Sequence, residues 1–479
     1  MNRCFDHGKT GRLGLRLGLG LRSGIRASLA ALILGALAAG FTARAQSPQA
    51  APANLFPHPI SRAEAVDIAL RHNSAILKGK ADLEAAHGVV VQLRSIAFPT
   101  LSARGSYNAD ESSLVENFPL PAPYNSVQFP TQNWNGDVRV QQSIYEGGRM
   151  TSAFRSAKLT RQQALLNYQA LLADTLLSVR VAYDDVLVAQ QQIAVNEASV
   201  KLLTHELEDV RRRFQAGTVP QFDVLRAHVE LANESPRLIQ ARNSYRIGKN
   251  NLLNLLGCNL PQTVWEDVPL ELSDTLQASP LDTDLPAALA RALEKRPELE
   301  ALRKVESLRR EDVVQAKAGF KPSAQVFGGY EWQSLPYENN QSQDLSGWTA
   351  GAQISWNIFD FGLTRGKIIE SRAHYERARL DVDETRRQIE LEVRTAWSNF
   401  IEAREVLESQ KTVQEEAEEA LRLAEARLAA GSSTQLDVLN AQTALTQART
   451  TRAQALHDYS VARARFQRAV GEDMEIVEK

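Results

Sequence analysis

The residue types that usually carry catalysis are scattered in this chain. Its eight histidines show no metal-ligand spacing, and the pair His205 and Glu206 stands alone on a helical stretch whose face we expect to be solvated. Combinations of Ser, His and Asp can be picked from any sequence of this length, so they do not indicate a catalytic triad. The chain also has no glycine-rich phosphate loop. The sequence therefore indicates a protein that is not an enzyme and that needs no cofactor and no metal.

Polar side chains recur instead beside two glycine turns. Asp223 and Arg226 follow Gly217, and Asp437 and Asn440 follow Gly431 at the same spacing. One interpretation is that the two aspartates cap the helix that returns after each turn, because a carboxylate accepts hydrogen bonds from the free N–H groups at a helix start. The glycines then end the preceding helices. A second role for these side chains is compatible with capping.

The two turns belong to an internal duplication. Residues 213–227 return as residues 427–441, an offset of 214, and the same offset carries Gln142–Tyr145 onto Trp356–Phe359. A period this long is unlike that of a solenoid. It indicates two fused halves related by a pseudo-two-fold axis.

Toward the N-terminus the offset becomes 223, where Phe98 and Pro99 line up with Phe320 and Pro322. The first copy therefore contains nine extra residues between Tyr107 and Tyr145 (223 − 214 = 9). Because insertions are tolerated in surface loops, residues 108–135 are predicted to form an exposed loop.

Residues 1–45 read as a secretory signal peptide. Four arginines precede an apolar run at residues 27–41, and Ala43, Arg44 and Ala45 offer a cleavage site with small residues. The run is shorter than the roughly 20 residues that span a bilayer as a helix. We therefore expect cleavage, with a retained N-terminal anchor as the alternative, and an extended segment at 46–60. The residue directly after the cut is Gln46 and not a cysteine, so a lipid anchor on a new N-terminal cysteine is not expected.

Composition excludes two further classes. Without residues 1–45 the chain keeps 48 of its 55 basic and 56 of its 57 acidic residues, a net charge near −8. Nucleic acid is therefore a poor candidate partner. Cys258 is then the single remaining cysteine, so no intramolecular disulfide can stabilise the exported chain.

Each half is predicted to contain a helix, two β-strands and two long helices, over residues 61–256 and 285–470. Residues 257–284 link the halves, and 471–479 form a C-terminal tail. The first helix is expected from Ser61 to about Ala97, before Pro99. Residues 151–216 contain no proline and predict one helix of roughly 100 Å with coiled-coil spacing. Partner helices should return from about Gln221 and Gln435.

The predicted strands alternate strictly between apolar and polar residues. Trp348, Ala350, Ala352 and Ile354 alternate with Thr349, Gly351, Gln353 and Ser355. Such strands, of about ten residues with aromatic ends, have the length of transmembrane β-strands. Four of them cannot close a barrel, so several subunits would have to complete one cylinder. The candidate lumen-lining residues are Arg104, Arg139, Gln141, Glu331, Gln353 and Ser355. The alternative is a half-buried sheet on a soluble core.

At this point the chain resembles the TolC family of outer-membrane efflux and secretion channels. Tyr145–Arg149 is similar to the family's strand exit, Phe359–Gly362 is a degraded second copy, and the turns at Gly217 and Gly431 resemble its helical hairpin tips. The resemblance implies a mainly α protein with a membrane β-barrel. Three copies would give four strands each to one 12-stranded barrel in the outer membrane, continued by an α-helical tunnel through the periplasm.

The resemblance also implies the function and the site. The protein would be the exit channel of a tripartite efflux or type I secretion system, docked at Gly217 and Gly431 by a periplasmic adaptor and driven by an inner-membrane pump or ABC exporter. Asp437 would form a ring of three carboxylates with raised pKa values, and Asn440 would replace a second acidic residue. Asp223 matches a residue of the family's closing contacts, for which Arg226 could be a partner. The alternatives are a secreted periplasmic coiled-coil scaffold or adhesin without a pore and, less favoured, a passive porin.

Overall fold

The computed structural model describes residues 58–115, 117–118, 121, 127–128, 130–258, 267–281, 283–335 and 343–472. The predicted signal peptide and the tail beyond residue 472 lie outside these ranges. The elements are α2 (Arg62–His72), α3 (Ser74–Ser95), β1 (Thr100–Ala109), η1 (Ser112–Leu114), β2 (Asn117–Phe118), β3 (Val127–Gln128), β4 (Gln132–Glu146), α4 (Arg149–Gln215), α5 (Gln221–Leu256), α6 (Leu285–Lys295), α7 (Pro297–Lys317), η2 (Ala318–Phe320), β5 (Ser323–Ser334), β6 (Asp344–Ser355), α8 (Leu363–Ala429) and α9 (Gln435–Val470).

The prediction of a single helix from Ser61 to Ala97 is wrong. The chain leaves the helical conformation at Asn73, whose ψ is 128°, so that α2 ends and α3 begins there. The Asn73 side chain accepts hydrogen bonds from the N–H groups of Ala75 and Ile76 and donates to the carbonyl of Leu255. An asparagine at this position supplies a cap that a helix interior would not need. The second half has the same break, because α6 and α7 are separated at Arg296.

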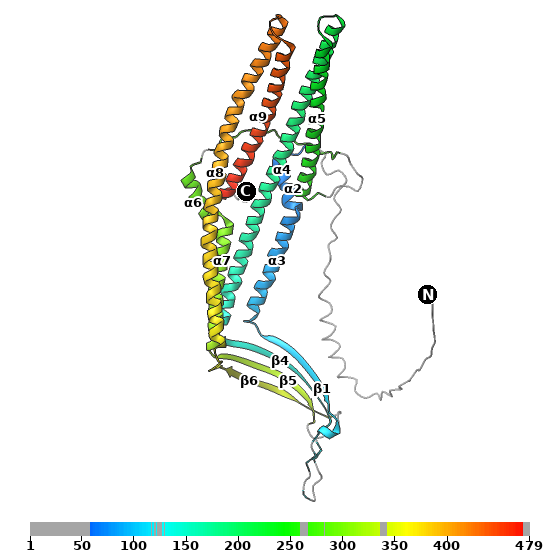
Figure 1. Cartoon of the computed structure of the whole chain (residues 1–479). Helices are drawn as coiled ribbons and strands as arrows, with labels where there is room; N and C mark the ends of the chain where they lie inside the picture. Colours follow the sequence, from blue (N-terminus) through cyan, green and yellow to red (C-terminus); the bar gives the residue numbers. More distant parts are fainter. Residues whose placement is uncertain are drawn as a thin grey trace, which may run out of the picture. The chain divides into compact units, whose positions relative to one another are not determined.

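Each break receives the end of another helix (Figure 1). The last turn of α5 lies against the α2–α3 break, and the end of α9 meets the start of α7 through an ion pair between Arg468 and Glu298. Gly257, which ends α5 with a φ of 73°, lies directly against the backbone of His72. In both halves a shorter helix therefore continues the course of a longer one: α3 continues α5, and α7 continues α9.

Two helices run without a break. α4 and α8 each have 67 residues, about 100 Å at 1.5 Å per residue. Both end as predicted, because Gly217 and Gly431 adopt left-handed φ values of 72° and 73° after the last turn. The returning helices begin at Gln221 and Gln435, also as predicted.

The helices form one layer with two levels (Figure 1). At the level nearer the strands, α3, α4, α7 and α8 lie side by side in that order, and at the level of the hairpin turns the order is α5, α4, α9 and α8. Within the described residues, α3, α5 and α8 lie at the edges of this layer, where the short helices α2 and α6 are their main other helical neighbours. Exposed apolar residues follow these edge helices, including Val89, Ile239, Ile369, Leu380 and Leu391.

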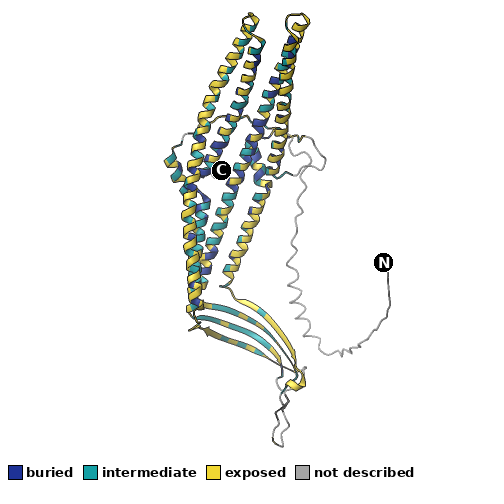
Figure 2. Cartoon of the chain, viewed as in Figure 1, coloured by how far each residue is buried: buried dark blue, intermediate teal, exposed yellow. Residues whose placement is uncertain are grey.

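Two apolar cores lie where the levels meet. The first joins α2, α4 and α5 around the fully buried Tyr183 and Leu252, and the second joins α6, α7, α8 and α9 around Phe400 and Phe466. Figure 2 shows these buried positions in the middle of the helical layer. The short helices α2 and α6 thus cover one face of the layer in matching places.

The strands form an antiparallel sheet in the order β1-β4-β5-β6. Within the described residues no helix packs on either face of this sheet, and β1 and β6 have unpaired outer edges. The predicted loop at 108–135 is shorter than expected. Ala109 and Gln132 still belong to the ladder, which extends β4 to 15 residues.

The structure corrects the alignment of the two halves before the strands. Gln142 donates from Nε2 to the carbonyl of Ala97, and its counterpart Trp356 donates from Nε1 to the carbonyl of Phe320. Ala97 therefore matches Phe320, and the offset of 223 applies without a gap. The expected match of Phe98 with Phe320 is therefore wrong, because it aligned two identical residues whose backbones do not occupy equivalent positions.

Replacing Gly257 with alanine should destabilise the protein more than replacing Gly217. Alanine at either position must adopt a left-handed conformation, which costs about 1–2 kcal/mol. Only at Gly257 would the added Cβ collide with the backbone of His72, because nothing lies within 4 Å of that position at Gly217. Thermal unfolding in detergent, followed by circular dichroism, measures the difference. Equal losses would contradict the close contact between α5 and the α2–α3 break.

Candidate functional site

All six predicted lumen residues lie on one face of the sheet. Residues paired across an antiparallel ladder point to the same side, and the register places Arg104 opposite Asp137, which is opposite Glu331. The same argument places Arg139, Gln141, Gln353 and Ser355 on this face. The sheet thus collects most of its charged and amide groups on one side.

Hydrogen bonds connect part of this polar face across three strands. Gln141 donates to Gln325 over 2.6 Å, and Gln325 donates to Gln353 over 3.1 Å. The guanidinium of Arg139 lies 4.6 Å from the ring centroid of Phe327. A face of amides and charges is readily hydrated, as is the polar interior of a water-filled β-barrel.

The opposite face is apolar and carries aromatic residues. Val138, Tyr330 and Trp348 are neighbours across three strands, and the rings of Tyr330 and Trp348 meet edge to face at 5.2 Å. Trp348 is 84% exposed and Leu101 is 72% exposed. An aromatic, apolar face of this size without cover indicates contact with lipid.

At the hairpin turn between α8 and α9, Asp437 has the capping role that was one of its two interpretations. Its carboxylate accepts hydrogen bonds from the backbone N–H of Thr434 and from the hydroxyls of Thr434 and Ser433, over 2.7 to 2.9 Å. These bonds lower the pKa of Asp437 in the single chain. Asp437 and Asn440 are both exposed to solvent.

The turn between α4 and α5 is built differently. Pro220 precedes α5, and no side chain caps this helix. The guanidinium of Arg226 lies over the ring of Phe222, 6.0 Å from its centroid, and within the described residues no ion pair joins Arg226 to Asp223. The capping interpretation is therefore wrong for Asp223, and the two hairpin turns differ in charge and in capping.

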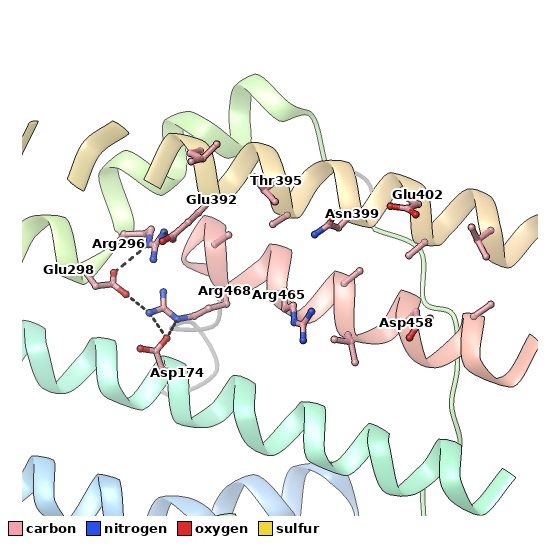
Figure 3. Close-up of a pocket in the computed structure, with 18 residues that line it drawn as sticks. Asp174, Arg296, Glu298, Glu392, Thr395, Asn399, Glu402, Asp458, Arg465 and Arg468 are labelled. Carbon is pink, nitrogen blue, oxygen red and sulfur yellow. Dashed lines mark hydrogen bonds and ion pairs between the residues drawn. The ribbon is translucent and has the colours of Figure 1, made fainter. Parts of the chain in front are cut away.

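A groove of about 920 Å³ lies between α8, α9 and the neighbouring part of α4. Figure 3 shows Arg468 reaching from α9 between Asp174 of α4 and Glu298 of α7, with Arg296 beside Glu392 of α8. Arg468 donates from Nε to Asp174 over 2.9 Å, and Arg296 donates from Nη1 to Glu392 over 2.5 Å. Arg296 and Arg468 are buried.

The carboxylate of Glu298 and the guanidinium of Arg468 remain charged in these ion pairs. Burial alone would raise the pKa of Glu298, but the hydrogen bond and charge of Arg468 outweigh it, and the pKa of Glu298 is lowered. Burial likewise opposes the charge of Arg468, but Glu298 and Asp174 raise its pKa above the ordinary value. The charges of Arg468 and Glu298, which hold α9 against α4 and α7, therefore persist at neutral pH.

A second polar cluster joins α4 to α9. Buried Asp184 accepts hydrogen bonds from Arg62 over 2.6 Å and from Ser460 over 2.5 Å, and burial raises the pKa of this carboxyl. Next to it, His457 contacts Asp185 at 2.7 Å and Asp458 at 3.0 Å. Burial would lower the pKa of His457, but its two carboxylate neighbours outweigh burial and raise it.

The sequence reasoning missed both polar clusters. The sequence signal for each cluster was a charged residue at a helix position where the apolar periodicity predicts a buried side chain. Asp184 stands in this way between Tyr183 and Val186, and Arg468 stands between Phe466 and Val470. A buried charge must have a partner. Spacing along one helix cannot say which helix provides it.

An uncovered sheet with one polar and one apolar face, continued by long paired helices, is the architecture of outer-membrane channel proteins. The family model described as "Outer membrane efflux protein" matches residues 65–258 and 288–472, one stretch in each half. The chain belongs to this family. It resides in the outer membrane, and its helices extend into the periplasm.

Individual relatives agree with this assignment. The chain is 26% identical over 351 residues to the alkaline protease secretion protein AprF of Pseudomonas aeruginosa, covering 71% of each chain. It is 24% identical over 390 residues to the outer membrane protein TolC of Vibrio cholerae, covering 79% of this chain and 87% of the relative. The CmeC outer membrane channel of Campylobacter jejuni has the same fold, with a TM-score of 0.73 at 15% identity over 86% and 85% of the two chains.

None of the helices that the structure describes has a stretch both long enough and apolar enough to pass through a lipid bilayer. No group of three or more His, Cys, Asp or Glu side chains in the described ranges is placed to hold a metal ion.

The contact between α4 and α9 should weaken as the pH rises. Because the pKa of His457 is raised above its unfolded value of 6.5, its stabilising effect is complete below that pH and is lost as the pH rises through the folded pKa. The thermal midpoint in detergent should therefore fall from about pH 6.5 upward, and His457→Gln should reduce this dependence. His205→Gln, at an exposed histidine of α4, is the control. An unchanged pH profile in His457→Gln would contradict the role of the pair.

Proposed function

We propose that three copies of this chain form one exit duct through the outer membrane. The observation that carries the proposal is the sheet with two unpaired edges, one polar face and one apolar face. In lipid every backbone polar group must be paired within protein, so the edges of identical copies have to meet. Two copies would give eight strands, a cylinder whose interior side chains fill, whereas three give 12 strands and leave an open lumen.

The helical layer would continue this cylinder into the periplasm. Its edge helices carry exposed apolar residues at both levels, which suits packing against the next copy. The hairpin turns at Gly217 and Gly431 are the points farthest from the sheet along α4 and α8 (Figure 1). Glycines there allow a helical hairpin of a periplasmic adaptor to approach closely, and we assign the docking surface to these turns.

The cargo and the energy would come from partners. The relatives include a protein named for alkaline protease secretion and the cobalt-zinc-cadmium resistance protein CzcC of Cupriavidus metallidurans, which is 24% identical over 393 residues. One duct design thus serves very different cargo. We propose a passive duct without enzymatic activity, driven by an inner-membrane pump or ABC exporter that selects the cargo. We favour this function over the alternative of a secreted coiled-coil scaffold without a pore.

We assign the constriction to the turn between α8 and α9. Three exposed Asp437 carboxylates would meet at the axis of the trimer, with Asn440 one turn further along α9. Their mutual repulsion would raise the pKa, against the lowering by the cap in the single chain. Asp223 and Arg226 would contribute from the turn of the first half. The cap and the ring use different lone pairs of the same carboxylate, so both roles are compatible.

Asp437→Asn should increase single-channel conductance or weaken block by divalent cations in planar bilayers, because it removes the charge and keeps an oxygen acceptor. Thr434→Ala is the matched control, since it removes the cap partner and keeps the carboxylate. The control should lower stability by about 1 kcal/mol and leave the divalent block in place. If Asp437→Asn changes neither conductance nor block, Asp437 is not part of the constriction.

A further inference from the structure

The strand pairs β1–β4 and β5–β6 correspond to each other in their pairing register as well as in their sequence. The β1–β4 ladder runs from Thr100 opposite Gln141 to Ala109 opposite Gln132, and it includes Tyr107 opposite Trp134. Adding 223 to the β1 residues and 214 to the β4 residues gives Ser323 opposite Ser355 and Tyr330 opposite Trp348, which are pairs of the β5–β6 ladder. The contact between β4 and β5 is therefore the one place where the structure shows how two such hairpins join.

This junction lengthens β4. Residues Gln142–Glu146 pair with Ser323–Val326 of β5, and β4 continues to Glu146. Their counterparts in the second half are Trp356–Asp360, but β6 ends at Ser355. Within the described residues no strand lies beside Trp356–Asp360, and Trp356, Ile358 and Phe359 are exposed. The missing neighbour explains the shorter strand.

We propose that Trp356–Asp360 become the continuation of β6 when they pair with Thr100–Ala103 of a second copy of this chain. The junction between copies would repeat the junction between β4 and β5. It places Gln353 opposite Ser106, Ser355 opposite Arg104, and Asn357 opposite Ser102 of the next copy. The proposal rests on the shared cylinder proposed above and gives its register.

The two faces of the sheet agree with this register. Ser355 and Arg104 lie on the polar face, whereas Ile354, which would face Gly105 of the next copy, lies on the apolar face. A slip by one residue would turn every side chain of one strand to the wrong face. The pairing also satisfies the free backbone groups of β1, which lipid could not do.

The helices beside the sheet support the same junction. Within the chain, the hydroxyl of Ser152 in α4 donates to the carbonyl of Glu311 in α7 over 3.1 Å. The offsets convert these residues into Gly366 of α8 and Gly88 of α3. A Cβ at either glycine would meet nothing within 4 Å in the single chain. Glycine weakens a helix interior. Close packing of α8 on the next copy's α3 would explain why both positions are glycine.

One position shows that the two junctions differ. Gly147 has a φ of 64°, and a Cβ there would come within 2.8 Å of the Ala318 carbonyl. Its counterpart Phe361 has a φ of 52° and is 92% exposed. The junction between copies must therefore be wider at this turn, where Phe361 would approach Phe98 of the next copy.

Cysteine cross-linking tests the register. In a Cys258→Ser background, Asn357→Cys with Ser102→Cys should join neighbouring chains on mild oxidation, because directly opposite Cα atoms lie about 4.5–5.5 Å apart, within disulfide reach. Asn357→Cys with Arg104→Cys is the matched control, displaced by two residues to about 7–8 Å. Ser143→Cys with Gln325→Cys, a pair seen within the chain, shows by its loss of reaction with a maleimide that the oxidation works.

The readout is the mass of the chain on non-reducing gels of outer-membrane extracts. A shift to multi-chain bands in the Asn357 and Ser102 variant, with one-chain bands in the control, supports the proposal. Equal linking in both variants, or linking in the control alone, overturns the register. A multi-chain particle in detergent without any linking overturns the junction and leaves the exit duct intact. A one-chain particle would overturn the exit duct as well.

Discussion

The pairing of backbone groups at the two edges of a four-stranded sheet is the constraint on which the rest of this structure depends. Neither β1 nor β6 has a partner on its outer side within the described residues, and no helix there covers the apolar face around Tyr330 and Trp348. Such a sheet is stable neither in water, because of its apolar face, nor alone in lipid, because of its free N–H and C=O groups. Closure among identical chains satisfies both conditions.

The helical layer also has edges that expose apolar surface, although its backbone groups are paired within each helix. One layer of helices, with α3 and α5 at one edge and α8 at the other, forms its two apolar cores near its middle, where α2 and α6 cover it. Ion pairs with one buried partner lie in the same region, where Arg468 of α9 binds Glu298 of α7 and Asp184 of α4 binds Arg62 of α2. Removing one partner of such a pair costs more than the pair contributes, so these contacts fix which helices are neighbours.

Much of this architecture follows from local chemistry in the sequence. Gly217 and Gly431 end helices because only glycine adopts the left-handed conformation without strain, and alternation around Gln353 and Ser355 defines a two-sided strand. The break at Asn73 could not be predicted, because its reason is the end of α5, 182 residues away, against which Asn73 bonds. The partners of Arg468 and Asp184 were equally inaccessible. The roles of Asp437 and Asn440 depend on other copies and stay predictions.

The two unbroken 67-residue helices have a mechanical consequence. Of the helices in the described layer, only α4 and α8 run from the hairpin turns to the strands, while their partners change from α5 to α3 and from α9 to α7 on the way. A rotation imposed at a hairpin turn is therefore transmitted as torque along two rods. α5 with α3, and α9 with α7, meet only through noncovalent contacts at the Asn73 and Arg296 breaks, so the backbones of α4 and α8 alone carry tension from the hairpin turns to the strands.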